Sequence, residues 1–245
     1  IVASPSESST NSALVGHVDT VPVVPNQQYK FDNDDLIGGR GSVDMKGGIA
    51  VMLHSWIENS SDIIGVFYTA EESSYIDNGL NIIMPILLSD FNIDFAIILE
   101  PTDNEIQLGC LGALNATLTI NGKAAHSARP WVGDNPIYKV KDVVKLVEDN
   151  EISEIEIDGL NFKQVMSITK ISSGIANNVI PETLKLNLNF RYSPELNGSE
   201  AGSYINDLFS DYVEVEIMNT SDGAMPNKSE DKISEFIKKT GSVVQ

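Results

Sequence analysis

The stretch Leu14–Pro22 constrains the fold most, because it joins a buried strand to a histidine and an aspartate. Its first residues read as the end of the strand, and Pro22 stops further pairing because it lacks an N–H group. His17 and Asp19 lie two residues apart, and such residues of a strand face the same side, so the Asp19 carboxylate can reach the His17 ring. A carboxylate beside an imidazole is typical of a zinc-binding histidine. A polar turn after a strand also explains this motif when it is taken alone.

Two further predicted strands end in carboxylates. The predicted strands are residues 63–70 and 94–99, and the predicted helices are residues 49–57 and 78–88, all apolar and buried. Glu71 and Glu72 follow the first of these strands, and Glu100 follows the second. Alternating strands and helices indicate a mainly parallel sheet, whose carboxyl ends lie along one edge and bind ligands. Because neighbouring side chains alternate, only one of Glu71 and Glu72 is expected to face a site directly.

A glycine-rich run, residues 38–48, contains Asp44 just before the first predicted helix. Aspartate commonly caps a helix at this place. Its carboxylate would also join those at the strand ends, giving five carboxylates and one imidazole at one edge of the sheet. Without a cation, the negative charges of these carboxylates would repel one another strongly. Independent caps and turns explain each residue singly, but not all of them together.

The composition is that of a globular protein, with 42% hydrophobic and 21% charged residues. The net charge of −19 argues against nucleic acid and anionic membrane surfaces as partners, because both attract basic patches. The single cysteine, Cys110, excludes an intramolecular disulfide and favours a cytoplasmic location. We expect Cys110 to be a small buried residue and His54 to be a core histidine. A polar loop, Pro25–Asp35, is expected to be anchored by Tyr29 and Phe31.

The pattern changes near Gly112 to an alternation of apolar and polar residues. The predicted strands are residues 114–120, 164–171, 183–191 and 212–218, and the predicted helices are residues 137–147 and 199–210. This β-α-β-β-α-β order is that of a ferredoxin-like α+β domain. We therefore expect an α/β catalytic domain (1–111), an inserted lid or dimerisation domain (112–220) and a returning catalytic segment (221–245).

Seven segments together resemble the motifs of one family. They are residues 16–22, 39–48, 69–72 and 100–102, and residues 122–130, 178–181 and 189–192 of the inserted domain. In this order they are similar to the co-catalytic zinc amidohydrolases and metallopeptidases, which include aminoacylase, acetylornithine deacetylase and succinyl-diaminopimelate desuccinylase. Residues 100–103, 125–129 and 157–160 most resemble the desuccinylases of actinobacterial type.

The resemblance implies a pair of zinc ions, with Co²⁺ as an alternative metal. His17 and Glu100 would bind one ion, Glu72 the other, and Asp44 would bridge the two. Ions about 3.5–4 Å apart need a bidentate carboxylate between them, and Asp44 at a helix start can supply it. Oxygen and imidazole ligands without thiolate suit catalytic zinc.

The resemblance also implies roles in catalysis and substrate binding. Asp19 would orient the zinc-binding histidine, and Glu71 would be the general base. His126 would reach the partner subunit's site and stabilise the oxyanion, although a structural loop histidine is the alternative. Asn178 and Arg191 would bind the carboxylate and the amide of the substrate.

The implied reaction is hydrolysis of N-succinyl-LL-2,6-diaminopimelate to succinate and LL-2,6-diaminopimelate, in lysine and diaminopimelate biosynthesis. Hydrolysis of acetylornithine, another N-acyl amino acid or a dipeptide stays open, as does a non-catalytic binding protein that dimerises. An exposed edge strand of the inserted domain favours a homodimer. The family's second zinc has a further histidine ligand after the inserted domain, but no histidine follows His126. We therefore expect a fragment that is inactive or poorly folded alone and leaves apolar sheet edges exposed.

Overall fold

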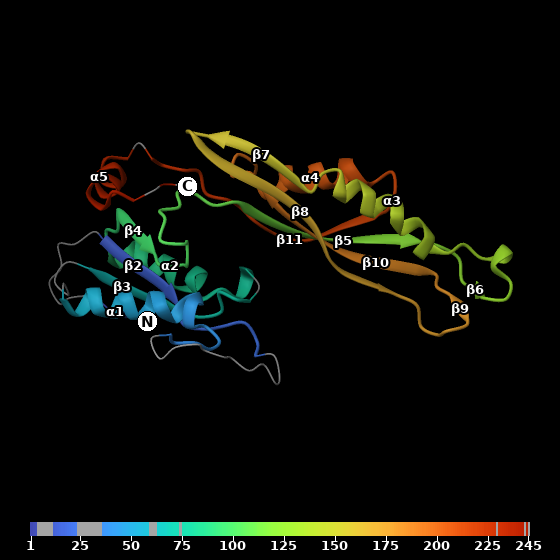
Figure 1. The fold of residues 1–245 in the computed structure, drawn as a ribbon, viewed down its shortest axis with the longest axis horizontal. Helices are drawn as coiled ribbons and strands as arrows, with labels where there is room; N and C mark the ends of the chain where they lie inside the picture. The colour runs from blue at the N-terminus through green and yellow to red at the C-terminus, as the bar shows by residue number, and fades with distance from the viewer. Residues whose placement is uncertain are drawn as a thin grey trace. The chain divides into compact units, whose positions relative to one another are not determined.

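The computed structural model describes residues 1–3, 12–23, 36–58, 63–73, 75–228, 230–242 and 244. These residues form two compact units (Figure 1). Unit 1 comprises residues 1–105 and 231–242, and unit 2 comprises residues 106–230 and 243–245. The predicted loop Pro25–Asp35, with Tyr29 and Phe31, lies outside the described residues.

Unit 1 contains a four-stranded, mainly parallel sheet, as the sequence predicts. Its elements are β1 (Val2–Ala3), β2 (Ser12–His17), α1 (Gly48–Glu58), β3 (Ile64–Tyr68), α2 (Gly79–Asp90), β4 (Phe95–Ile98) and α5 (Asp231–Thr240). The strand order is β1-β3-β2-β4, in which β2 runs parallel to β3 and β4 and β1 runs antiparallel to β3. The carboxyl ends of β2, β3 and β4 therefore share one edge.

Helices α1 and α2 pack on opposite faces of this sheet. Gly16 faces α1 so closely that an added Cβ would lie 2.8 Å from the Met52 Sδ. Val15, which points to the other face, belongs to the apolar cluster that contains Leu87 of α2. The absence of a side chain at Gly16 thus allows α1 to approach the strand that carries the histidine.

The prediction that α1 and β4 are buried is wrong. Met52 is buried on α1, but the Ile57 side chain is 71% exposed, and Ile98 of β4 is 58% exposed. His54, predicted to be a core residue, is exposed on α1. The physical reason is that no described element covers the outer side of α1 or the face of β4 that carries Ala96 and Ile98. β4 is also the last strand of the described sheet. This edge shows the apolar exposure that the sequence analysis expects.

Unit 2 contains a five-stranded antiparallel sheet and a short two-stranded ribbon. Its elements are β5 (Gly112–Asn121), β6 (Ala125–His126), α3 (Pro136–Glu148), β7 (Ile152–Ile157), β8 (Leu160–Ser173), β9 (Val179–Ile180), β10 (Thr183–Tyr192), α4 (Gly198–Phe209) and β11 (Glu214–Ser221). The sheet order is β11-β5-β10-β8-β7, and β6 pairs with β9. The predicted β-α-β-β-α-β order is present, with β7 as an added edge strand. A turn at Asp158 and Gly159, both with positive φ, joins β7 to β8.

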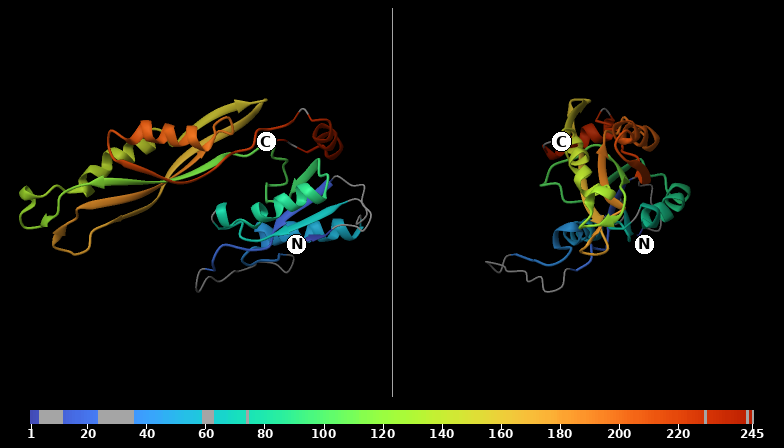
Figure 2. Two further views of the ribbon diagram at one scale, coloured as in Figure 1. Left: turned by 180° about the vertical axis from the view of Figure 1, so that it is seen from behind. Right: turned by 90° about the vertical axis from the view of Figure 1, so that its right-hand side faces the viewer.

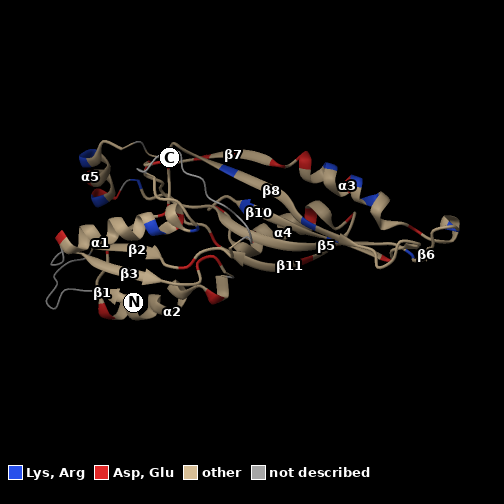
Figure 3. Cartoon of the chain, turned by 60° about the horizontal axis from the view of Figure 1, so that its bottom comes forward, with Lys and Arg blue, Asp and Glu red and all other residues tan. Residues whose placement is uncertain are grey.

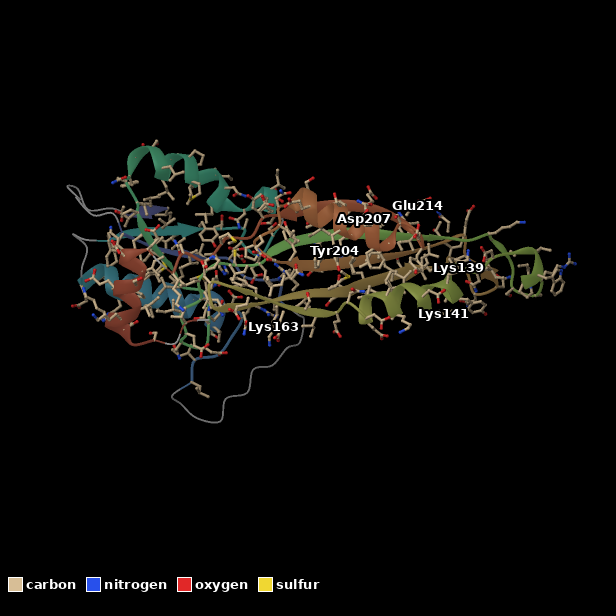
Figure 4. The ribbon with its side chains drawn as sticks, turned by 90° about the horizontal axis from the view of Figure 1, so that it is seen from above. Lys139, Lys141, Lys163, Tyr204, Asp207 and Glu214 are labelled. Carbon is tan, nitrogen blue, oxygen red and sulfur yellow. The ribbon has the colours of Figure 1, made fainter. Side chains whose placement is uncertain are left out.

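Helices α3 and α4 cover one face of the five-stranded sheet (Figure 2). Figure 4 labels Lys139 and Lys141 on α3, and Tyr204 and Asp207 on α4. The Tyr204 ring stacks on Phe190 of the sheet, with ring centroids 5.6 Å apart. Val143, Val147, Ile205 and Phe209 are among the helix residues that complete the core with alternate residues of β5. Unit 2 thus has a hydrophobic core of its own.

Truncation within this core gives the first testable prediction. Leu118 is fully buried, so Leu118→Ala should lower the free energy of unfolding by about 2–5 kcal/mol. Ile175 is 94% exposed, so the same loss of apolar side chain in Ile175→Ala should change it by less than about 0.5 kcal/mol. Urea unfolding followed by circular dichroism measures both changes. Equal changes for the two variants would contradict the placement of the core.

Cys110 is exposed, so the prediction that it is buried is wrong. Its backbone exchanges two hydrogen bonds with Ala224, of 2.9 and 3.0 Å, and these hold the chain at the surface of unit 2. None of the described helices is long and apolar enough to cross a bilayer.

Candidate metal centre

The candidate site lies where β2 and β3 end side by side. His17 pairs with Tyr68 in the parallel register, and the Val18 N–H continues the pairing to the Tyr68 carbonyl at 2.9 Å. Asp19 therefore lies beside the residues that follow Tyr68. Acidic residues gather beyond the ends of these two strands (Figure 3).

His17 is the centre of the site, and its side chain is fully buried. Its Nε2 atom lies 2.9 Å from the Asp44 Oδ1 and 3.6 Å from the Glu100 Oε1. Its Nδ1 atom lies 3.4 Å from the Asp19 Oδ1, but without hydrogen-bond geometry, and it has no hydrogen-bond partner in the described residues. Charge attraction, rather than a hydrogen bond, therefore links the Asp19 carboxylate to the imidazole in this structure.

Two groups of possible metal ligands share His17. One contains His17, Asp44 and Glu100, and the other contains His17, Glu71 and Glu72, with ligand atoms within 4.8 Å of one another in each group. The expectation that only one of Glu71 and Glu72 faces the site is thus wrong. Both residues lie beyond the end of β3, after a reversal at Ala70 with φ +60°, so strand alternation does not apply to them.

Asp44 belongs to an irregular turn, Ser42–Gly47, that leads into α1. Asp44 and Met45 have non-helical dihedral angles, and the peptide bond between them is cis. The Met45 side chain is fully buried, and its sulfur accepts the His17 backbone N–H at 3.3 Å. The glycine-rich run therefore returns to the end of β2 and places Asp44 against the histidine.

The charges of the site perturb one another. Burial alone would lower the pKa of His17, but the contact with Asp44 and the surrounding carboxylates outweigh it and raise the pKa above its usual value. Burial raises the pKa of Glu71 and of Glu100, and neighbouring carboxylates add to this effect although His17 opposes it. The clustered carboxylates therefore favour a positive charge beside them, which either a protonated His17 or a bound cation would supply.

The residues present fit a zinc-like divalent ion. Zinc bonds of about 2.0–2.2 Å in a tetrahedral site place the ligand atoms about 3.3 Å apart. The distances of 2.9 and 3.6 Å from the His17 Nε2 to Asp44 and Glu100 lie on either side of that value. Imidazole nitrogen and carboxylate oxygen, without thiolate, are the donors of catalytic zinc sites.

A cleft of about 360 Å³ opens beside Asp44 and Glu72. Arg40 lines it, and sequence reasoning did not select this residue, although it is the only cation within the glycine-rich run before Asp44. Tyr68 was also missed: its ring meets the His17 ring edge-on, with centroids 6.1 Å apart. The strand register, in which Tyr68 stands opposite His17, is the signal that could have found it.

The remaining predicted residues belong to unit 2. His126 is exposed on β6, and its Nδ1 accepts the Ala128 N–H at 3.1 Å. The Ser127 N–H donates to the Asn178 carbonyl at 2.9 Å, so the ribbon brings His126 and Asn178 together. Arg191 lies near the other end of β10, eight residues beyond Thr183, which corresponds to roughly 26 Å along the strand. Unit 2 therefore does not gather these three residues into one group.

Comparisons with known proteins agree with this architecture. The family model for the M20 peptidase dimerisation domain matches residues 108–215. A putative succinyl-diaminopimelate desuccinylase of Mycobacterium tuberculosis is 35% identical over 97% of this chain and 68% of the relative. The chain belongs to the M20 family of metallopeptidases. A succinyl-diaminopimelate desuccinylase of Corynebacterium glutamicum is 34% identical over 93% of the chain and 64% of that relative.

Two solved structures show the same fold. A tripeptidase from Staphylococcus aureus matches all of the chain and 69% of its own length, with a TM-score of 0.68 and 20% identity. An M20 family metallo-carboxypeptidase from Sulfolobus solfataricus matches 98% of the chain and 72% of its own length, with a TM-score of 0.70 and 14% identity. The M20 chain therefore spans about two thirds of the length of its relatives, and it has the α/β fold with an inserted α+β domain that the sequence predicts.

Proposed function

We propose that the full-length M20 protein hydrolyses N-succinyl-LL-2,6-diaminopimelate to succinate and LL-2,6-diaminopimelate. Here, full-length means a polypeptide that also carries the third of the relatives' length that this chain does not span. The observation that carries the proposal is the convergence of Asp44, Glu71, Glu72 and Glu100 on the buried His17. The desuccinylase relatives, at 28–35% identity, support the choice of substrate.

Two zinc ions are the proposed cofactors. His17 and Glu100 would hold one ion, Glu72 the other, and Asp44 would contact both. When bound, such ions lower the pKa of water and polarise the carbonyl of an amide, which is otherwise a poor electrophile. Two groups of possible ligand atoms at the end of the sheet support a pair of ions, and Asp44 and Glu72 both line the same cleft.

Glu71 is the proposed general base. Its raised pKa, caused mainly by burial, makes its carboxylate a better proton acceptor than an exposed one. Glu71 would take a proton from the attacking water and donate it to the leaving amine nitrogen. The Asp19 carboxylate, 3.4 Å from Nδ1, would stabilise positive charge on the His17 ring.

Substrate binding and the dimer involve unit 2. The match to a peptidase dimerisation domain supports a homodimer, and β7 and β11 are the sheet edges available for pairing. We assign to His126 stabilisation of the oxyanion in the site of the second copy, and to Asn178 and Arg191 binding of the substrate's carboxylate and amide. A small N-acyl amino acid as substrate, a cytoplasmic location and the absence of nucleic-acid or membrane partners complete the proposal, in agreement with the net charge of −19.

An assay of the full-length protein tests this proposal. We expect turnover of N-succinyl-LL-2,6-diaminopimelate with a kcat/KM at least about a hundredfold above that for N-acetylornithine, a preference of the size that paired polar groups in a site can give. The isolated residues 1–245 serve as a control and should be inactive. A preference for N-acetylornithine would contradict the substrate assignment. If neither compound is turned over in a zinc-dependent way, the proposal that the protein is an enzyme of this kind is contradicted.

The site also predicts how zinc affinity depends on pH. Because the pKa of His17 is raised, its imidazole stays protonated to a higher pH than a free histidine, and zinc must displace that proton. Zinc affinity should therefore rise with pH until the pH exceeds the raised pKa, and fall at lower pH. Titration calorimetry in two buffers of different ionisation enthalpy measures the proton release. Zinc binding without proton release at pH 6 would contradict the assignment of His17 as a ligand.

A further inference from the structure

We infer that Asp19 is a positioning residue for Glu71 and Glu72, in addition to its contact with His17. The Asp19 Oδ1 accepts the Glu71 backbone N–H at 3.3 Å, and the Oδ2 accepts the Glu72 backbone N–H at 3.2 Å. One carboxylate thus uses both of its oxygens to hold the backbone that carries the proposed base and the proposed zinc ligand.

The backbone after β3 is shaped to receive this carboxylate. Ala70 has a left-handed conformation, with φ +60°, and the next two N–H groups both point at Asp19. Successive N–H groups after such a reversal form a concavity that binds anions. Here the anion is a side chain of the same protein.

The register of the sheet explains why Asp19 is the residue that fills the concavity. His17 stands opposite Tyr68, and the Val18 N–H donates to the Tyr68 carbonyl. The segments that follow β2 and β3 therefore leave the sheet side by side. Asp19 then lies beside the reversal at Ala70. On the other side of the turn, the Gly79 N–H at the start of α2 donates to the Thr69 carbonyl at 2.8 Å.

Each oxygen of the Asp19 carboxylate accepts a different backbone N–H group. Two acceptor oxygens are needed, because hydrogen bonds from both N–H groups must be satisfied at once. An asparagine has one acceptor oxygen, and its NH₂ group would face the second N–H donor.

The inference concerns the same site as the proposed function, and its importance for hydrolysis rests on that function. Its test uses metal-free protein, so it succeeds or fails independently of any turnover. In the full-length protein, hydrogen–deuterium exchange at the amides of Glu71 and Glu72 is compared between the wild type, Asp19→Asn and Asp19→Ala. Asp90→Asn, which removes an exposed carboxylate of α2, is the matched charge control.

We expect Asp19→Ala to accelerate exchange at both amides by about tenfold or more, because charge-assisted hydrogen bonds are lost. Asp19→Asn should accelerate one of them. The amides of Val18 and Gly79, which bond to backbone carbonyls nearby, should keep their rates. Unchanged exchange at Glu71 and Glu72, or equal acceleration at Val18 and Gly79, would overturn the inference.

Zinc titration of the same variants supplies a second readout. Asp19→Asn should lower the affinity for the ion held by Glu72 by about tenfold or more, and the affinity for the ion held by His17 and Glu100 by less. If the substitution only disturbed the fold, the affinity for both ions would fall equally. Selective weakening of the His17 ion would show that Asp19 serves only the histidine, which would also overturn the inference.

Discussion

Replacement of Glu71 by glutamine should lower kcat of the full-length protein by about 10²–10⁴-fold, the usual contribution of a general base. Glutamine has nearly the same shape, but its amide cannot accept the proton of the attacking water. Burial raises the pKa of the Glu71 carboxyl, so the wild-type kcat should fall as the pH drops through that raised pKa, and this limb should vanish in the variant. Steady-state assays between pH 5 and 9 measure both effects.

The zinc content of Glu71→Gln distinguishes the role of Glu71 from that of Glu72. Both Glu71 and Glu72 lie within ligand distance of the same histidine, so the geometry by itself allows either to bind zinc. If Glu71 is the base, the variant keeps its zinc while Glu72→Gln loses an ion. Loss of zinc from Glu71→Gln, with zinc retained in Glu72→Gln, would reverse the two roles. Full activity of Glu71→Gln would remove Glu71 from the mechanism.

Replacement of Asp44 by asparagine should have the largest effect on the metal. Its carboxylate lies 2.9 Å from the buried His17 Nε2, in a turn fixed against β2 by the Met45 sulfur. Asparagine has a single carbonyl oxygen and no charge, so it cannot bridge two cations. We expect the zinc content to fall to one equivalent or less and kcat/KM to fall by at least about a thousandfold, since such ions stabilise the transition state by several kcal/mol.

Elemental analysis after exhaustive dialysis measures the zinc content of Asp44→Asn. Asp90→Asn makes the same chemical change on the exposed end of α2 and should keep the wild-type zinc content and activity. Wild-type zinc content in Asp44→Asn would contradict the bridging role. A similar loss in Asp90→Asn would mean that net charge, rather than ligation, determines zinc retention.

Much of the site could be predicted because strand ends in a parallel sheet converge. His17, Glu71, Glu72 and Glu100 each follow an apolar run, and the strands β2, β3 and β4 do share one edge. The sequence did not predict the orientation of Glu71 and Glu72, because it depends on the left-handed conformation of Ala70. Alanine rarely adopts this conformation, and only the bonds to Asp19 reveal why it does so here.

The fold was predicted less well where apolar residues are exposed. The runs that form α1 and β4 are as apolar as buried elements, yet Ile57 and Ile98 are exposed. Periodicity records which face of an element is apolar, but not whether another element covers that face. β7 was missed because its residues, Ile152–Ile157, alternate irregularly with glutamates, and its pairing is set by the Asp158–Gly159 turn.

Anomalous diffraction at the zinc absorption edge tests the central claim most directly. In crystals of the full-length protein grown with zinc, we predict two anomalous peaks: one in contact with His17, Asp44 and Glu100, and one in contact with Asp44 and Glu72. The carboxylates would then close around the ions that balance their charge. Crystals with no anomalous peak at these residues, or with zinc bound only elsewhere on the surface, would contradict the account.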